Sequence, residues 1–256
     1  MARQFPTDRT AVVSGAGSQR GIGRAAAHRL AREGWAVGLI DVDADAIVEL
    51  AGELHREYDV AAHAVGVDVG DADAVRAAID EIEAALPPLV GLANVAGVSS
   101  PTPYLELADE EWLRVLRINL DGVHYVTRRV AASMVEQGVG RIVSISSASA
   151  QTGGGTYSKT PYSVAKAGVL GLTRALAREL GPYGITVNAI APGPIDTDIM
   201  GGTLTDERKR AMVATLLVDR VGTTDDIASA IRFLLEEESG YITGQTINVN
   251  GGLYLQ

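Results

Sequence analysis

A tyrosine and a lysine stand four residues apart in the segment Tyr162-Ser163-Val164-Ala165-Lys166. On a helix this spacing places the phenol and the ammonium group on one face. The pKa of a free tyrosine lies near ~10, and a positive charge beside the hydroxyl favours the phenolate, so we expect Lys166 to lower the pKa of Tyr162. The pair can then act as a general acid and base. Because such spacings also arise by chance, the interpretation depends on the surrounding elements.

The residues around the pair predict a helix. Thr160 can cap it, Pro161 suits its first position, and Gly181-Pro182 ends it. Apolar side chains recur at helical spacing along this stretch, at Ala165, Val169, Leu172 and Leu176.

A glycine-rich turn near the start of the chain indicates a phosphate site. The apolar strand predicted at 10–14 runs into Gly15-Ala16-Gly17-Ser18-Gln19-Arg20-Gly21-Ile22-Gly23, and an amphipathic helix follows. Glycines without a β-carbon let the backbone approach a pyrophosphate, and the helix N-terminus supplies unpaired N–H groups.

An acidic residue comes directly after the next predicted strand, at 36–40. Asp41 follows it, about 20 residues beyond the glycines. A carboxylate there can accept both hydrogen bonds of an adenosine ribose diol, and it repels a 2′-phosphate. Capping of the helix that follows Asp43 is an alternative role, and the two are compatible.

Strands alternate with helical stretches through the rest of the chain, with strands expected at 61–67, 89–94, 141–145, 185–191 and 246–249. This alternation predicts an α/β fold with a doubly wound, mostly parallel, seven-stranded sheet flanked by helices on both faces. One long helix is expected from 109 to about 134, with Asn119 in its middle. The uneven segment 195–217 is expected to be a substrate lid, and residues 1–256 form a single domain without an internal boundary.

The composition and net charge of the chain limit the kinds of partner that it is expected to bind. The formal net charge is −10, which argues against nucleic acid and against an anionic membrane surface. The chain has no Cys, which removes thiolate chemistry and fits a reducing cytoplasm. No apolar leader or long apolar run is present, so we expect a cytoplasmic protein with no membrane partner. The four histidines show no paired spacing, so no metal is expected.

In a doubly wound sheet, ligands bind beyond the carboxyl ends of the strands. The chemistry-bearing motifs fall at those ends, namely the glycine turn, Asp41, Asp68, Asn94–Gly97, Ser147 and 192–197. These motifs, in this order, resemble the short-chain dehydrogenase/reductase family of single-domain Rossmann enzymes, including its 3-oxoacyl reductases. The resemblance covers nearly the whole chain and also includes Asn119, Asn188, Pro192-Gly193, Tyr241-Ile242-Thr243-Gly244 and Val249-Asn250-Gly251-Gly252.

The resemblance implies a function for each motif. Tyr162 would exchange a proton at the substrate oxygen, Lys166 would hold the nicotinamide ribose, Ser147 would bond the substrate oxygen, and Asn119 would position a water. The implied cofactor-binding residues, besides Tyr162 and Lys166, are Gly17, Arg20, Gly21, Ile22, Gly23, Asp41, Asp68, Val69, Asn94, Ala96, Gly97, Pro192, Gly193, Ile195 and Thr197.

The chain departs from the family pattern in several places. The glycine turn is two residues longer than usual, with Gly17-x-x-x-Gly21-x-Gly23 as the best register. Asn94-Val95-Ala96-Gly97 keeps only the first Asn of the usual Asn-Asn-Ala-Gly. Ser147 lies two residues further from Tyr162 than usual, so Ser149 is its rival.

The cofactor signals conflict. Arg20 resembles the basic residue that meets a 2′-phosphate in members that use NADP, whereas Asp41 opposes one. A carboxylate against a phosphate dianion is costly, so NAD is expected and NADP is the alternative.

The leading prediction is therefore an NAD-dependent oxidoreductase that interconverts a secondary alcohol and a ketone. The alternatives are an NADPH-dependent 3-oxoacyl-thioester reductase and a catalytically silent nucleotide-binding protein. Ser149, Gln151 and Tyr157 are expected to contact substrate, and no Arg pair suggests a clamp for an acid, so a neutral ketone or polyol is expected. The glycine-rich C-terminus resembles the part of family members that packs between subunits, which implies a homotetramer.

Overall fold

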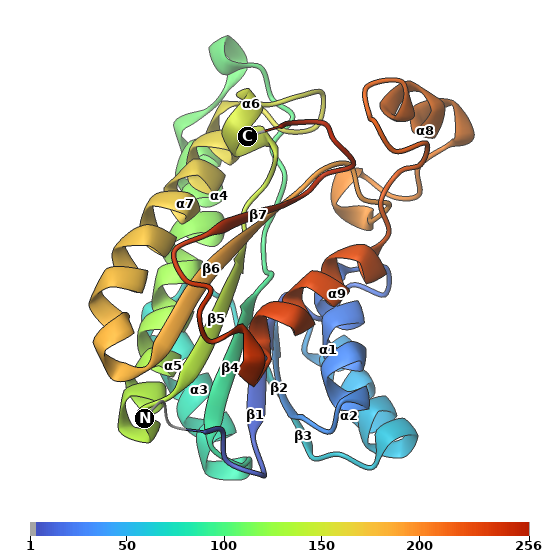
Figure 1. The fold of residues 1–256 in the computed structure, drawn as a ribbon. Helices are drawn as coiled ribbons and strands as arrows, with labels where there is room; N and C mark the ends of the chain where they lie inside the picture. Colours follow the sequence, from blue (N-terminus) through green and yellow to red (C-terminus); the bar gives the residue numbers. More distant parts are fainter. Residues whose placement is uncertain (1–3, 256) are drawn as a thin grey trace.

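A computed structural model describes residues 4–255 of the chain. Its centre is a seven-stranded sheet in the order β3-β2-β1-β4-β5-β6-β7, in which every pair of neighbouring strands is parallel (Figure 1). The strands are β1 (Thr10–Ser14), β2 (Ala36–Asp41), β3 (Ala62–Gly66), β4 (Leu89–Asn94), β5 (Gly140–Ile145), β6 (Ile185–Pro192) and β7 (Thr246–Val249). The chain order reverses between β1 and β4, which is where a doubly wound sheet binds its ligand.

Helices cover both faces of the sheet (Figure 1). One face carries α1 (Ile22–Arg32), α2 (Ala44–Tyr58) and α9 (Thr224–Leu235). The other carries α3 (Ala72–Ala85), α4 (Asp109–Leu116), α5 (Gly122–Gln137) and α7 (Thr160–Leu180). The expected fold is confirmed, and the sheet is parallel throughout. No helix among residues 4–255 is both long and apolar enough to cross a bilayer.

The central strands are apolar because both of their faces are covered. Along β1, Ala11 and Val13 pack into the core beneath α1 and α9, whereas Val12 packs into the core beneath α3 and α5. All three side chains are fully buried. Continuous apolar strands of this kind hold the polar residues at their carboxyl ends in fixed positions.

The helix predicted from 109 to 134 differs from the expectation. It runs as α4 and α5, but the turn between them, Arg117–Asp121, is a π-helix. Such wide turns are rare and often occur at functional sites. Asn119 lies within this turn and is fully buried, which explains an amide in the middle of a long helix.

Two short segments complete the carboxyl end of the sheet. The four-residue α6 (Ser149–Thr152) follows β5, and α8 (Asp206–Val213) belongs to the segment that follows β6. Figure 1 shows α8 set apart from the body of the molecule, beyond the strand ends. The remaining turns of helix are 3-10 in form, at Tyr104–Glu106, Gly181–Tyr183, Asp198–Met200 and Glu237–Ser239.

The first turn of α7 also differs from the prediction. Thr160 is the first helical residue rather than the cap, and Lys159 occupies the cap position without a side-chain hydrogen bond. Pro161 lies in the first turn, where its missing N–H costs nothing, and the helix ends at Leu180 as Gly181-Pro182 predicted.

Candidate active site

Two adjoining pockets lie at the carboxyl ends of the strands. The first, which we call the Asp41 pocket, has a volume of about 450 Å³ and runs between the glycine turn, Asp41 and Asp68. The second, the Tyr162 pocket, has a volume of about 560 Å³ and contains Tyr162. Both are lined by Ile22, Val95, Gly97, Thr197 and Ile199. Because they share these lining residues, the two pockets adjoin each other at the carboxyl ends of the strands.

The glycine turn fits tightly against the loop after β4. Gly15 has a φ of +72°, and a β-carbon there would lie 2.6 Å from the backbone of Ala96. A β-carbon on Gly23 would lie 2.2 Å from the carbonyl oxygen of Gly15. Ser14 Oγ accepts hydrogen bonds from the N–H groups of Val95 (3.0 Å) and Ala96 (3.2 Å). Gly15 and Gly23 are therefore required for packing, and Ser14 holds the pocket floor.

Asp41 lies at the rim of the Asp41 pocket. Its carboxylate accepts hydrogen bonds from the backbone N–H groups of Gly17 (2.8 Å) and Asp43 (3.0 Å). The cap of α2 is Asp43, which accepts from Ala46 N at 3.1 Å. The capping role considered for Asp41 thus belongs to its neighbour, and the Asp41 carboxylate is fixed beside the glycine turn.

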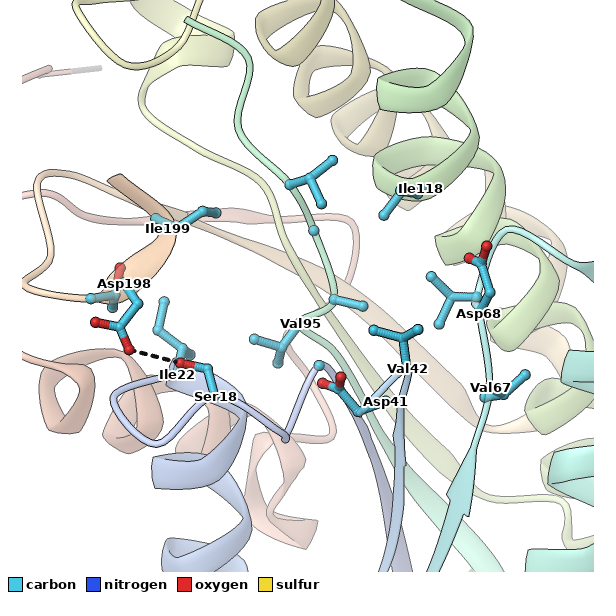
Figure 2. A pocket seen from close by; sticks show the side chains of 17 residues that line it. Ser18, Ile22, Asp41, Val42, Val67, Asp68, Val95, Ile118, Asp198 and Ile199 are labelled. Carbon is cyan, nitrogen blue, oxygen red and sulfur yellow. Dashed lines mark hydrogen bonds between the residues drawn. The ribbon is translucent and has the colours of Figure 1, made fainter. Parts of the chain in front are cut away.

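The far end of the Asp41 pocket is apolar apart from one acid. Figure 2 shows Val42, Val67 and Asp68 on the side opposite Ser18 and Asp198. Asp68 forms an ion pair with Arg117 at 3.0 Å and accepts from Gly70 N at 2.8 Å. Flat apolar walls with a hydrogen-bonding edge are suited to a purine base.

Arg20 points toward the segment that follows β6. Its guanidinium forms ion pairs with Asp196 (2.5 Å) and Asp198 (3.4 Å) and a hydrogen bond with Thr203. Ser18 Oγ also donates to Asp198 Oδ2 at 3.3 Å, as Figure 2 shows. These contacts join the glycine turn to the segment after β6, and Arg20 is absent from the linings of both pockets.

The Tyr162 pocket brings together a serine from the loop after β5 with a tyrosine and a lysine from α7. Ser147 acts on the Tyr162 hydroxyl so as to lower its pKa. Lys166 Nζ lies 5.7 Å from the centre of the Tyr162 ring and donates to the Ile145 carbonyl at 2.8 Å. Ser146 Oγ donates to the Lys166 carbonyl at 2.8 Å, so it anchors the same turn of the helix.

The acid–base properties of the pair differ from the sequence prediction. Burial raises the pKa of Tyr162, and the hydrogen bond from Ser147 partly opposes that rise. Burial also lowers the pKa of Lys166 to about 8, because the residue is only 2% exposed and desolvation penalises its charged amine. The sequence predicted a lowered pKa for Tyr162, whereas desolvation of the buried phenol acts the other way and raises it.

Asn119 braces the loop after β4. Its side-chain amide donates to the carbonyls of Val98 (2.9 Å) and Val115 (3.0 Å), and its oxygen accepts from Val98 N at 3.2 Å. A β-carbon on Gly97 would lie 2.6 Å from this oxygen and 3.4 Å from Lys166 Nζ. The side chain is therefore committed to holding Gly97 beside Lys166, and the water-positioning role stays a prediction.

Most of the other predicted residues line one pocket or both. The Asp41 pocket contains Gly21, Ile22, Asp41, Asp68, Val69, Ala96, Gly97 and Thr197. The Tyr162 pocket contains Ser147, Ser149, Tyr157, Tyr162, Lys166, Pro192, Gly193 and Ile195. Residues predicted for the site but absent from both linings are Gly17, Arg20, Gly23, Asn94, Asn119 and Gln151. Asn94 is buried and donates to Thr127 (2.9 Å) and Ser144 (3.2 Å), which is a packing role.

Sequence reasoning missed Ser14, Ser146 and Arg208. Ser14 and Ser146 follow the rule that polar side chains at strand ends face the ligand, so this signal was present. Arg208 lies on α8 and lines the Tyr162 pocket, although nothing local in the charged run 206–210 singles it out. Within residues 4–255, no cluster of three or more His, Cys, Asp or Glu side chains is arranged to hold a metal ion.

Residues 15–254 match a family model described as enoyl-(acyl carrier protein) reductase. An uncharacterized short-chain type dehydrogenase/reductase of Sinorhizobium fredii is 40% identical over 96% of this chain and 98% of its own length. A 3-oxoacyl-[acyl-carrier-protein] reductase of Aquifex aeolicus is 37% identical over 93% of this chain and 95% of its own length.

Two solved structures agree with these sequence matches. A 3-oxoacyl-[acyl-carrier protein] reductase of Brucella melitensis with bound NAD superposes with a TM-score of 0.88 at 33% identity, covering 98% of this chain and 92% of that one. A blue fluorescent protein from a metagenomic library, in complex with NADPH, gives 0.88 at 34% identity, covering 96% and 98%.

A Rossmann sheet with two adjoining pockets at its carboxyl edge, one of them lined by Ser, Tyr and Lys, is typical of a nucleotide-dependent oxidoreductase. The chain belongs to the short-chain dehydrogenase/reductase family, and it is an NAD(P)-dependent oxidoreductase.

Proposed function

We propose that the protein is an NAD-dependent dehydrogenase that interconverts a secondary alcohol and a ketone, with Tyr162 as the general acid and base. The observation that carries this proposal is that Ser147, Tyr162 and Lys166 line one pocket, which adjoins the Asp41 pocket. The effect of Ser147, which acts to lower the pKa of Tyr162, supports the assignment. It also favours Ser147 over its rival Ser149, whose backbone N–H donates to Ser147 Oγ at 3.1 Å.

The nicotinamide cofactor, when bound, supplies the hydride chemistry. Tyr162 then removes the hydroxyl proton as an alcohol becomes a ketone and returns it in the reverse direction. Ser147 holds the substrate oxygen beside that hydroxyl. Lys166 faces Gly97, where it can bind the nicotinamide ribose, while the glycine turn and the N-terminus of α1 offer N–H groups to the pyrophosphate.

The charges of the Asp41 pocket support NAD over NADP. Its lining contains Asp41, Asp68 and Asp198 and no Lys or Arg. Arg20, the one sequence signal for a 2′-phosphate, is occupied by Asp196 and Asp198. A phosphate dianion beside Asp41 would meet a fixed carboxylate without a compensating cation.

The 3-oxoacyl-thioester reductase remains the second candidate, because the Aquifex and Brucella relatives carry that name. The Brucella reductase structure contains bound NAD, so an NAD preference alone does not separate the two candidates. Comparing the turnover of acetoacetyl-coenzyme A with that of simple secondary alcohols separates the two candidate functions.

Assembly and location belong to the same proposal. A homotetramer in the cytoplasm is what the family resemblance and the absence of Cys support. Phe233 on α9 and Tyr241 in the segment before β7 have exposed aromatic side chains, which supports burial between subunits. Sedimentation velocity tests the assembly.

The decisive experiment screens secondary alcohols with NAD and NADP at alkaline pH and compares kcat/KM. We expect NAD to be preferred by at least about tenfold, since one uncompensated charge contact is worth about 1.5–3 kcal/mol. Asp41→Ser should reduce this preference. Tyr162→Phe should abolish turnover while the variant still binds NADH, measured by fluorescence titration. A wild-type preference for NADP, or full activity of the Phe variant, contradicts the proposal.

A further inference from the structure

Three consecutive residues at the end of β5 all act on the first turns of α7. The Ile145 carbonyl accepts a hydrogen bond from Lys166 Nζ at 2.8 Å. The Ser146 hydroxyl donates to the backbone carbonyl of the same lysine, also at 2.8 Å. The next residue, Ser147, acts to lower the pKa of Tyr162. One short segment therefore holds both the amine and the backbone of the lysine and also influences the tyrosine.

The bond from Ser146 is not needed to complete the helix. In a regular α-helix the carbonyl of Lys166 accepts from the N–H group four residues further on, so the serine supplies a second donor to it. Ser146 is only 1% exposed, and its own N–H donates to the Ile190 carbonyl of β6 at 2.8 Å. Its side chain thus joins a fixed point of the sheet to one turn of α7.

The chain between α6 and α7 does little to fix the position of α7. It contains Gly153-Gly154-Gly155, and the first two have φ values of +85° and +119°. A β-carbon on the first or the third of these glycines would meet nothing within 4 Å. Ala165 and Val169 bury α7 against the sheet, but apolar contacts are not directional. A directional bond such as that of Ser146 is therefore required to set the register of the helix.

From this geometry we propose that Ser146 is a positioning residue for the reaction. By holding the backbone of Lys166 against the end of β5, it places Lys166 and Tyr162 in register with Ser147. The inference rests on the proposed dehydrogenase function and adds a residue that acts through Lys166. Proton exchange at Tyr162 depends steeply on distance, because a displacement of about 1 Å can cost about a hundredfold in rate.

The test measures Ser146→Ala with NAD and the secondary alcohol that the wild type oxidises fastest in the screen, which includes 2-butanol, 2-octanol and cyclohexanol. We expect kcat to fall about tenfold. The dissociation constant of NADH, from fluorescence titration, should stay within about threefold, because the glycine turn and the N-terminus of α1 are unchanged. The profile of kcat against pH should move to higher pH, since poorer alignment with Ser147 and Lys166 stabilises the Tyr162 phenolate less.

Thr173→Val is the matched control. Thr173 is 2% exposed, and its hydroxyl donates to the Val169 carbonyl at 2.8 Å in the same helix. This variant also removes one buried hydroxyl that bonds a helix carbonyl, so it should lower the melting temperature to a similar extent and leave kcat and its pH profile unchanged. Ser146→Cys fills a similar volume with a weaker donor and should give an intermediate kcat. It takes the place of Ser146→Ala if that variant does not fold.

The outcomes separate this inference from the proposed function. A Ser146→Ala variant with the kcat and pH profile of the wild type overturns the positioning role and leaves the dehydrogenase function intact. So does a fall in kcat by the same factor at every pH, which a purely structural role would give. An equal loss of kcat in Thr173→Val also overturns it, because any buried hydroxyl of α7 would then serve. A wild type that oxidises no alcohol in the screen overturns both.

Discussion

The buried amine of Lys166 makes the stability of the protein depend on pH in a way that can be calculated. Burial lowers its pKa from 10.5 to about 8. Between these values the unfolded chain binds the proton more strongly than the folded one, so the free energy of unfolding rises with pH. Below pH 8 both states are protonated, and burying the charge costs about 3 kcal/mol, at about 1.4 kcal/mol per unit.

As the pH rises from 7 to 10, the folded protein loses this charge, and about 2.5 kcal/mol of the lost stability returns by the same relation. Lys166→Met removes the titration. The free energy of unfolding of the wild type minus that of the variant should therefore increase by about 2.5 kcal/mol over this range. Other titrating groups are common to both proteins, so their effects cancel in the difference. Loss of the hydrogen bond from Lys166 to Ile145 also contributes to the difference between the two proteins, but this contribution varies less with pH.

The assay is urea unfolding followed by the fluorescence of the buried Trp35, at pH steps from 7 to 10 and at one fixed protein concentration. Lys159→Met, at the partly exposed cap position of α7, is the control and should give a flat difference. A difference for Lys166→Met that stays flat within about 0.5 kcal/mol would refute the claim that burial depresses this pKa.

Two further predictions concern glycines and the lid. Gly23→Ala should destabilise the fold by several kcal/mol and weaken NADH binding, because its β-carbon meets the Gly15 carbonyl at 2.2 Å. Gly171→Ala, with nothing within 4 Å in the helix α7, should instead stabilise by about 0.5–1 kcal/mol; thermal melts compare the two. Asp196→Asn breaks the ion pairs with Lys209 and Arg20, so α8 amides should exchange hydrogen faster and KM should rise by up to about fivefold. Unchanged exchange in α8 would contradict the lid assignment.

The strands could be predicted because their signal is local. Thr10–Ser14, Leu89–Asn94 and Thr246–Val249 begin and end at the predicted residues. The strands β2, β5 and β6 differ by one residue at one end, and β3 is one residue shorter at each end. Apolar runs bounded by Gly, Pro or Asp mark strands covered on both faces. The positions of Ser147, Tyr162 and Asp41 at the sheet's carboxyl edge follow from that pattern alone.

Other features depend on contacts between distant segments. A β-carbon on Gly23 would meet the Gly15 carbonyl, and one on Gly15 would meet the Ala96 backbone, so the packing roles of these two glycines depend on contacts that the sequence pattern does not display. The π-helical turn at Asn119 depends on the bonds of that side chain to Val98 and Val115. Arg20 carries a local signal for a phosphate, but its partners Asp196 and Asp198 lie about 180 residues away.

The pKa values of Tyr162 and Lys166 shift in directions that their spacing alone does not predict. Free lysine and tyrosine lose their protons at similar pH, near ~10. In the fold the ammonium of Lys166 is lost first and the phenol of Tyr162 last, because burial penalises each charged form. Because burial destabilises the ammonium of Lys166, that ammonium stabilises the Tyr162 phenolate only weakly. Ser147 is the group that already favours the phenolate. For Lys166 to contribute as well, polar groups of the ligand must solvate its ammonium, so the Tyr-Lys spacing alone does not provide acid–base activity.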